Sequence, residues 1–195
     1  MDFFLEHYVR GLMGRASLPD GLVRTLHELA DRAAATPRVF CHRDYHCRNL
    51  MVLRDGSLGM VDIQDARWGP DTYDLASLLR DAYMDIEEEL VLALIERYRS
   101  ALPDPPEPSA FRRRFDVVAA ERMIKALGTF GYQAAVLGRT QYLEGVPRTL
   151  DRLERLLPET EGGAPLLASL READIFTVPP SAPPARRQPA AATQK

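Results

Sequence analysis

The chain has 195 residues, of which 46% are hydrophobic and 27% are charged, and its net charge is -3. This length suits one globular domain, and the small negative charge gives no electrostatic reason to expect nucleic acid or an anionic membrane as a partner. No stretch stays apolar over the roughly 18 residues that a membrane span needs, and the first residues lack the order of a signal peptide. With two cysteines, no disulfide framework is expected, and a reducing cytoplasmic location fits.

Most of the sequence predicts helices, because apolar residues recur at three- and four-residue intervals on either side of a strand-like run at 38–41. The expected helices cover about 2–13, 19–36, 72–82, 86–101, 109–138, 147–157 and 164–173. From residue 174 the chain is rich in Pro and Ala, so we expect one domain over 1–173 and a disordered tail over 174–195. The predicted fold class is mainly α with a small β-hairpin.

The hairpin is predicted where two short apolar runs flank a turn centred on Asp55-Gly56. An Asp-Gly pair readily adopts the positive φ angles of a tight two-residue turn. Counting back along both strands from such a turn places Asn49 opposite Asp62. Opposed side chains on one face have Cβ atoms about 4.5–5.5 Å apart, so an amide and a carboxylate oxygen can share a hard cation such as Mg²⁺.

Asp44 lies five residues before Asn49 in a loop that leads into the same hairpin. Its carboxylate is then free to accept a proton from a substrate near the expected metal. Phosphoryl transfer needs this division of labour, in which one aspartate deprotonates the attacking hydroxyl. The asparagine and the second aspartate hold the metal that neutralises phosphate charge.

Three segments, "HRDYHCRN", "VDIQDA" and "YDLASLL", resemble a known family. They match the pattern H-x-D-x-H-x-x-N, then I/V-D, then D-L-A, of the aminoglycoside phosphotransferase and choline kinase-like superfamily, which has a protein-kinase-like fold. Within that superfamily, residues 41–83 look like bacterial anomeric kinases that phosphorylate N-acetylmuramate and N-acetylglucosamine at C1 during peptidoglycan recycling. The resemblance implies a kinase-like C-terminal lobe that uses ATP and Mg²⁺.

The resemblance also implies a role for each matching residue. Asp44 would be the catalytic base, and Asn49 and Asp62 would be the Mg²⁺ ligands. The residues that would support the catalytic loop are His42, Arg43 and Asp74. The candidates for contact with sugar or phosphate are His46, Arg48, Asp65 and Arg67.

A zinc site is an alternative interpretation of the same loop, since its cysteines and histidines are all metal-binding residue types. They are Cys41, His42, His46 and Cys47. Adjacent Cys-His and His-Cys pairs lack the two- to four-residue separation that lets paired ligands wrap a tetrahedral ion, and the sequence has no second Cys/His cluster. We therefore favour the phosphotransferase interpretation.

Two glycines and two aromatic residues near these motifs have structural interpretations. Gly128 and Gly131 fall inside a predicted helix and are expected to allow close helix packing or a kink, without forming a phosphate loop. Trp68 and Tyr73 either line a sugar pocket or pack the loop against the helical core.

A kinase of this fold also needs an N-terminal lobe with a phosphate-covering loop and a strand lysine. The sequence has two lysines, Lys125 in a helical segment and Lys195 at the end of the tail, and no Gly-rich loop follows a strand. We therefore expect the C-terminal lobe alone. The chain would be a truncated sugar kinase, would pair with a separate N-lobe chain, or would be a non-catalytic remnant that binds a sugar or a partner.

Overall fold

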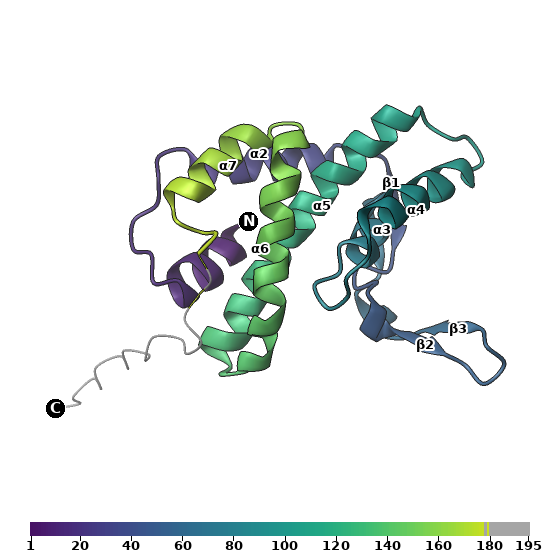
Figure 1. The fold of residues 1–195 in the computed structure, drawn as a ribbon, viewed down its shortest axis with the longest axis horizontal. Coiled ribbons are helices and arrows are strands. Elements are labelled where there is room, and N and C mark those ends of the chain that lie inside the picture. The colour runs from purple at the N-terminus through teal and green to yellow at the C-terminus, as the bar shows by residue number, and fades with distance from the viewer. Residues whose placement is uncertain (178, 180–195) are drawn as a thin grey trace.

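The computed structural model describes residues 1–177 and residue 179, and most of them are helical (Figure 1). The α-helices are α1 (Asp2–Phe4), α2 (Leu22–Ala34), α3 (Tyr73–Leu79), α4 (Glu88–Ser100), α5 (Pro108–Gly131), α6 (Val146–Leu156) and α7 (Gly163–Glu172). Two π-helical segments continue α1 and α5, over Leu5–Leu12 and Tyr132–Val136. Short 3-10 helices cover Cys47–Asn49, Ile63–Asp65, Thr140–Gly145 and Leu157–Glu159. The predicted mainly α fold class is confirmed.

A second strand pair was not predicted. Strand β1 (Arg38–Cys41) pairs antiparallel with β4 (Arg67–Pro70), with Cys41 opposite Arg67. The sequence Arg-Trp-Gly-Pro has no alternating apolar pattern and contains two residues that weaken strands, so β4 carries no local strand signal. Because β1 and β4 pair, the motif segment and the hairpin form one long loop that begins at the end of β1 and ends at the start of β4.

The predicted hairpin is present, as β2 (Leu50–Val52) and β3 (Leu58–Met60), but its predicted turn is wrong. The amide of Leu53 donates to the carbonyl of Ser57 at 2.8 Å, which leaves three residues in the loop. Gly56, the last of them, has a φ of 82°. Three-residue hairpin loops of this kind end with a residue in the left-handed region, a conformation that glycine adopts without steric cost.

The longer loop shifts the strand register by one residue. Leu50 pairs with Met60, and the amide of Val61 donates to the carbonyl of Asn49 at 3.1 Å. Asn49 is therefore opposite Val61, and the predicted direct pairing of Asn49 with Asp62 is wrong. Asp62 follows the strand with a φ of 70°, which turns the chain away from the ladder.

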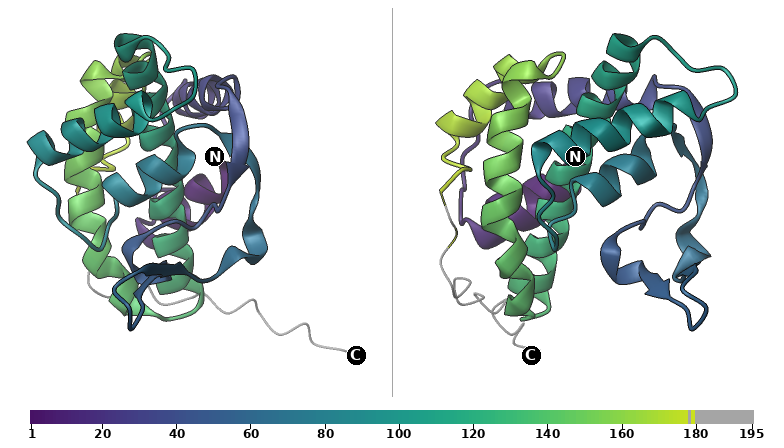
Figure 2. Two further views of the ribbon diagram at one scale, coloured as in Figure 1. Left: turned by 90° about the vertical axis from the view of Figure 1, so that its right-hand side faces the viewer. Right: turned by 45° about the vertical axis from the view of Figure 1, so that its right-hand side comes forward.

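Helix α5 runs through the middle of the helical body, where it packs against α1, α2, α3 and α6 (Figures 1 and 2). Its fully buried large side chains are Phe111, Phe115, Ile124 and Leu127. A Cβ atom on Gly131 would lie 2.5 Å from the carbonyl oxygen of His7, and one on Gly128 would lie 3.0 Å from the Phe4 backbone. The two glycines therefore let the N-terminal helical segment approach α5 closely, as the sequence predicts.

The β2–β3 hairpin projects from the helical body (Figure 1 and the right-hand view of Figure 2) and exposes several apolar side chains. Trp68, on β4, is also 62% exposed, so it does not pack against the helical core, whereas Tyr73 is buried in α3. None of the described helices combines the length and apolarity needed to cross a membrane.

The C-terminal boundary of the packed domain lies beyond residue 173, because the side chain of Ile175 is fully buried in the core. The rest of the predicted tail falls mainly on residue 178 and residues 180–195, which lie outside the described part of the chain.

Candidate active site

The loop after β1 is held in place by the carboxylate of Asp74, in the first turn of α3. Its Oδ2 accepts the amide of His42 at 2.7 Å, and its Oδ1 accepts the amide of Arg43 at 2.9 Å. Arg43 has a φ of 73°, in the left-handed region that non-glycine residues rarely occupy. Two hydrogen bonds to one carboxylate offset the cost of that conformation and set the direction in which the loop leaves β1.

The buried side chain of His42 joins the loop to the hairpin. Its Nδ1 accepts the amide of Asp44 at 3.3 Å, and its Nε2 lies 2.9 Å from the carbonyl oxygen of Val61. Because Nδ1 accepts, the ring proton is on Nε2 and is donated to Val61. His42 thus positions the backbone of Asp44 relative to the end of β3.

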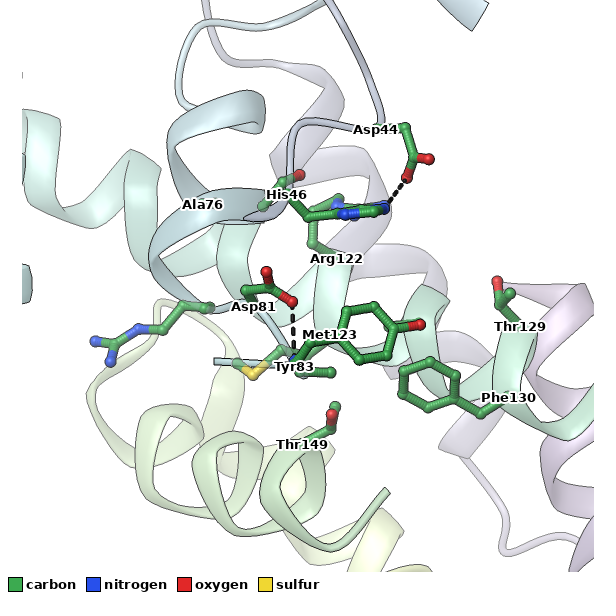
Figure 3. Close-up of a pocket in the computed structure, with 14 residues that line it drawn as sticks. Asp44, His46, Ala76, Asp81, Tyr83, Arg122, Met123, Thr129, Phe130 and Thr149 are labelled. Carbon is green, nitrogen blue, oxygen red and sulfur yellow. Dashed lines mark hydrogen bonds and ion pairs between the residues drawn. The ribbon is translucent and has the colours of Figure 1, made fainter. Parts of the chain in front are cut away.

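The carboxylate of Asp44 is bound on both oxygens. Asn49 Nδ2 donates to its Oδ2 at 3.0 Å and to its carbonyl oxygen at 2.9 Å, and His46 Nε2 lies 3.3 Å from its Oδ1 (Figure 3). The hydrogen bond from His46 lowers the pKa of Asp44, and with Asn49 and the charge of Arg122 it outweighs burial, which raises the pKa. Asp44 is therefore ionised at neutral pH and able to accept a proton.

Asp81, after α3, is a second anchor that the sequence analysis missed. It is buried, and its Oδ2 accepts the amide of Cys47 while its Oδ1 accepts the amide of Tyr83, each at 2.9 Å. Arg152 of α6 donates to its carbonyl oxygen at 2.7 Å. Its only sequence signal is its place in "DLASLLRDAY", directly after the third motif.

Asp44 borders a pocket of about 120 Å³ between the loop, α3, α5 and α6 (Figure 3). Its polar lining includes Asp44, His46, Arg80, Asp81, Arg122 and Thr129. Tyr83 and Phe130 add two aromatic rings, 6.3 Å apart between centroids and edge to face. A pocket with polar groups and aromatic faces beside an ionised carboxylate suits a polar organic substrate such as a sugar.

Residues 3–111, more than half of the chain, match the sequence profile of the phosphotransferase enzyme family APH. The chain belongs to the APH family. This assignment places the mainly α fold in a kinase-like lobe and accounts for the three motifs that the loop, the hairpin and α3 contain.

Members of the APH family with similar sequences include three bacterial proteins named N-acetylmuramate/N-acetylglucosamine kinase. The one from Neisseria meningitidis serogroup B is 40% identical over 154 residues, which are 76% of this chain and 46% of that protein. The Pseudomonas aeruginosa protein is 39% identical over 150 residues, 73% of this chain and 44% of its own length. The Caulobacter vibrioides protein is 36% identical over 121 residues, 60% of this chain and 33% of its own length. The matched segments cover between a third and about half of the length of these relatives.

The pocket extends beyond the APH match, which ends in the first turns of α5. Arg122 and Phe130 lie farther along that helix, where the sequence looks like an ordinary buried helix. Sequence reasoning missed both, because no local pattern shows which side of a long helix faces a loop some 80 residues earlier.

Of the four candidates for substrate contact, the structure places one in the pocket and three outside its lining. His46 lines the pocket, whereas Arg48 does not line it and has its guanidinium 3.5 Å from the centroid of the Tyr83 ring. Asp65 and Arg67 are exposed beyond the hairpin and do not line the pocket. Arg43, expected to support the loop, also stacks on Tyr73, with its Cζ 4.9 Å from the ring centroid.

The expected Mg²⁺ ligands supply hard oxygen donors of the type that Mg²⁺ prefers. The Nδ2 of Asn49 donates a hydrogen bond to Asp44, so the amide oxygen of Asn49 is available to bind a cation. Asp62 is exposed, and one of its oxygens accepts Gln64 Nε2 at 2.7 Å. Both residues lie where the hairpin meets the loop, so their chemistry fits a magnesium ion held jointly with substrate phosphates.

The zinc alternative gains no support from residues 1–177. Cys41 is buried, with its Sγ 3.3 Å from the carbonyl oxygen of Pro70, and burial raises its pKa to about 11. The imidazole of His42 is engaged by backbone groups on both nitrogens. These side chains are committed to packing and to backbone hydrogen bonds.

Proposed function

We propose that this chain is the base-carrying and acceptor-binding lobe of a sugar kinase that transfers the γ-phosphoryl group of ATP to a sugar hydroxyl. The acceptor we propose is the anomeric hydroxyl of N-acetylmuramate or N-acetylglucosamine. The observation that carries the proposal is the ionised Asp44, bound by Asn49 and His46, at the edge of the polar and aromatic pocket. The names of the three relatives support the acceptor class.

The residues divide the chemistry as follows. Asp44 accepts the proton of the sugar hydroxyl as that oxygen attacks phosphorus. Asn49 and His46 orient the Asp44 carboxylate and keep it ionised. Asn49 and Asp62 would hold Mg²⁺, which supplies charge neutralisation for the phosphates when bound.

The nucleotide-covering half of the enzyme would come from a kinase-like N-terminal lobe, either preceding this segment in a longer protein or on a separate chain. The relatives are about twice as long as the segment they share with this chain. Because ATP and cell-wall recycling intermediates meet in the cytoplasm, we propose that location for the whole protein. An intact mass well above 21.9 kDa for the protein in its own cells would support a continuous enzyme.

The test is phosphoryl transfer by the native full-length protein and by this chain joined behind the N-terminal half of the Neisseria meningitidis relative. Each is given Mg·ATP with N-acetylmuramate or N-acetylglucosamine, and sugar 1-phosphate is followed by phosphorus NMR. Asp44→Asn should lower kcat about 10²- to 10⁴-fold, the usual contribution of a general base. Asp55→Asn, in the exposed hairpin turn, is the matched control and should leave kcat unchanged.

An unchanged rate in Asp44→Asn would remove Asp44 from the base role. If neither protein turns over but both bind the sugars in calorimetry, the alternative of a non-catalytic sugar-binding module is supported instead. A substrate panel in which another alcohol greatly outperforms both amino sugars would overturn the proposed acceptor class.

A further inference from the structure

Arg122 and Lys125 form a pair of cations on α5 that meet at one phenol. Arg122 Nη1 and Lys125 Nζ donate to the hydroxyl of Tyr73 at 3.0 and 2.9 Å. Arg122 Cζ also lies 4.8 Å from the centroid of the Tyr73 ring, within the range of cation–π attraction. Tyr73 thus gathers two positive charges from successive turns of the helix.

Neither cation forms an ion pair among the described residues. Both side chains are only partly exposed, and the Nε of Arg122 is buried without a hydrogen-bond partner. The guanidinium of Arg43, 4.9 Å from the Tyr73 ring centroid, adds a third positive charge. Two neighbouring carboxylates, Asp44 and Asp74, are bound by other groups, so cation donors remain available at this place.

The position of Arg122 assigns its guanidinium to the acceptor side of Asp44, whereas Lys125 is not among the residues that line the pocket. Arg122 lines the pocket together with Asp44 and His46 (Figure 3). Asn49 and Asp62, proposed for Mg²⁺, lie where the loop meets the hairpin and do not line the pocket, and the hairpin projects from the helices (Figure 1). A ligand group that reaches Arg122 would therefore belong to the sugar.

We propose that Arg122, held at the pocket by the Tyr73 hydroxyl, forms a subsite for a carboxylate on the acceptor sugar, and that Lys125 adds positive charge from outside the pocket lining. This inference rests on the proposed function and deepens it by naming what distinguishes the two acceptors. Muramate differs from glucosamine by a lactyl ether with a carboxylate, and the planar guanidinium of arginine binds carboxylates through two parallel hydrogen bonds. N-acetylmuramate engages the subsite through this group, whereas neutral N-acetylglucosamine uses only the rest of the pocket.

The experiment compares both sugars in the same full-length protein. Arg122→Gln should raise KM for N-acetylmuramate on the order of 10- to 100-fold, because it removes a charged hydrogen bond, and Lys125→Met, which removes only a nearby charge, should raise it by about 2- to 5-fold. In Arg122→Gln, the rise in KM should be about 10-fold larger for N-acetylmuramate than for N-acetylglucosamine. Arg113→Gln, the same substitution on an exposed part of α5, is the matched control and should alter neither value.

The outcomes distinguish failure of the proposed subsite from failure of the proposed function. Equal losses with both sugars, or a fall in kcat shared by both, would mean that the cations serve phosphoryl transfer or packing and would overturn the subsite. Wild-type turnover of N-acetylglucosamine without N-acetylmuramate would also overturn the subsite and leave the proposed function standing. Turnover of neither sugar would instead contradict the proposed function. Thermal unfolding checks that Arg122→Gln is folded, and Lys125→Met keeps Arg122 against Tyr73 as a second, independent test.

Discussion

Asn49 is joined to Asp44 by two hydrogen bonds from a single amide nitrogen, to the carboxylate at 3.0 Å and to the carbonyl oxygen at 2.9 Å. The same side chain presents its amide oxygen elsewhere, where we propose that it holds Mg²⁺. One asparagine would therefore connect the proposed base to the proposed metal, with the two roles using different atoms of one amide group.

Replacing Asn49 with aspartate separates these roles. Asn49→Asp keeps an oxygen ligand but removes the donor and places a second carboxylate against Asp44, which raises the pKa of one of them. We expect the acidic limb of the pH profile of kcat/KM to move upward by about one unit or more, without a weaker requirement for Mg²⁺. Asn49→Ala, which loses both functions, should also raise the Mg²⁺ concentration for half-maximal rate. An unshifted acidic limb in Asn49→Asp would contradict the contact.

His46 should control the pH range in which Asp44, the proposed base, is ionised. Its hydrogen bond is the largest influence that lowers the pKa of Asp44, so the base is lost only when the pH falls through this depressed value. His46→Ala should raise the pKa of Asp44 and shift the acidic limb of kcat/KM to higher pH. His46→Gln, whose amide can still donate, should lie closer to the wild type. Identical acidic limbs in all three proteins would show that His46 does not affect the base.

Asp81 should control the reactivity of Cys47. Burial, followed by hydrogen bonding and repulsion from Asp81, raises the pKa of Cys47 to about 11, so little thiolate exists at neutral pH. Asp81→Asn should lower the pKa of Cys47 and speed its alkylation by iodoacetamide, measured by peptide mass spectrometry. Cys41, whose pKa is also raised to about 11 but without Asp81, is the internal control. Equal acceleration at both cysteines would indicate general loosening and would contradict a specific Asp81 contact.

The close approach at Gly131 predicts a stability effect. A methyl group there would meet the carbonyl oxygen of His7 at 2.5 Å and the Cα of Tyr8 at 2.7 Å, and neither backbone can move cheaply. Gly131→Ala should lower the free energy of unfolding by about 1–3 kcal/mol, despite alanine's better helix propensity. Urea denaturation measures this, with Arg113→Ala on the exposed part of α5 as a control expected within about 0.5 kcal/mol. A Gly131→Ala protein as stable as wild type would rule out the tight contact.

Much of the local structure is predictable from the sequence, because helices depend on contacts between residues three or four apart. The segment at 109–138 matches α5 and its π-helical continuation within a few residues. The closeness of Asp44 and Asn49 is also predictable, because only five positions separate them in a short loop between a strand and a hairpin. The role of Asp74 follows only from the resemblance to the kinase-like family, since its contacts with the loop join residues 31 and 32 positions apart.

The strand register of the hairpin could not be predicted from local sequence rules. Asp55-Gly56 predicts a turn, but both a two-residue and a three-residue loop suit the same pair, and the choice moves Asn49 from Asp62 to Val61. A one-residue change in loop length is energetically small and yet changes every cross-strand partner.

The sequence by itself determined the helical fold class, the presence of the hairpin and the closeness of Asp44 and Asn49, since each depends on neighbours along the chain. Only the tertiary structure decided the β1–β4 pairing, the anchor at Asp81 and the meeting of Arg122 and Lys125 with Tyr73. The last contacts join residues 49 and 52 positions apart. Such contacts depend on which faces of α3 and α5 pack together, and that is settled by the burial of the whole core.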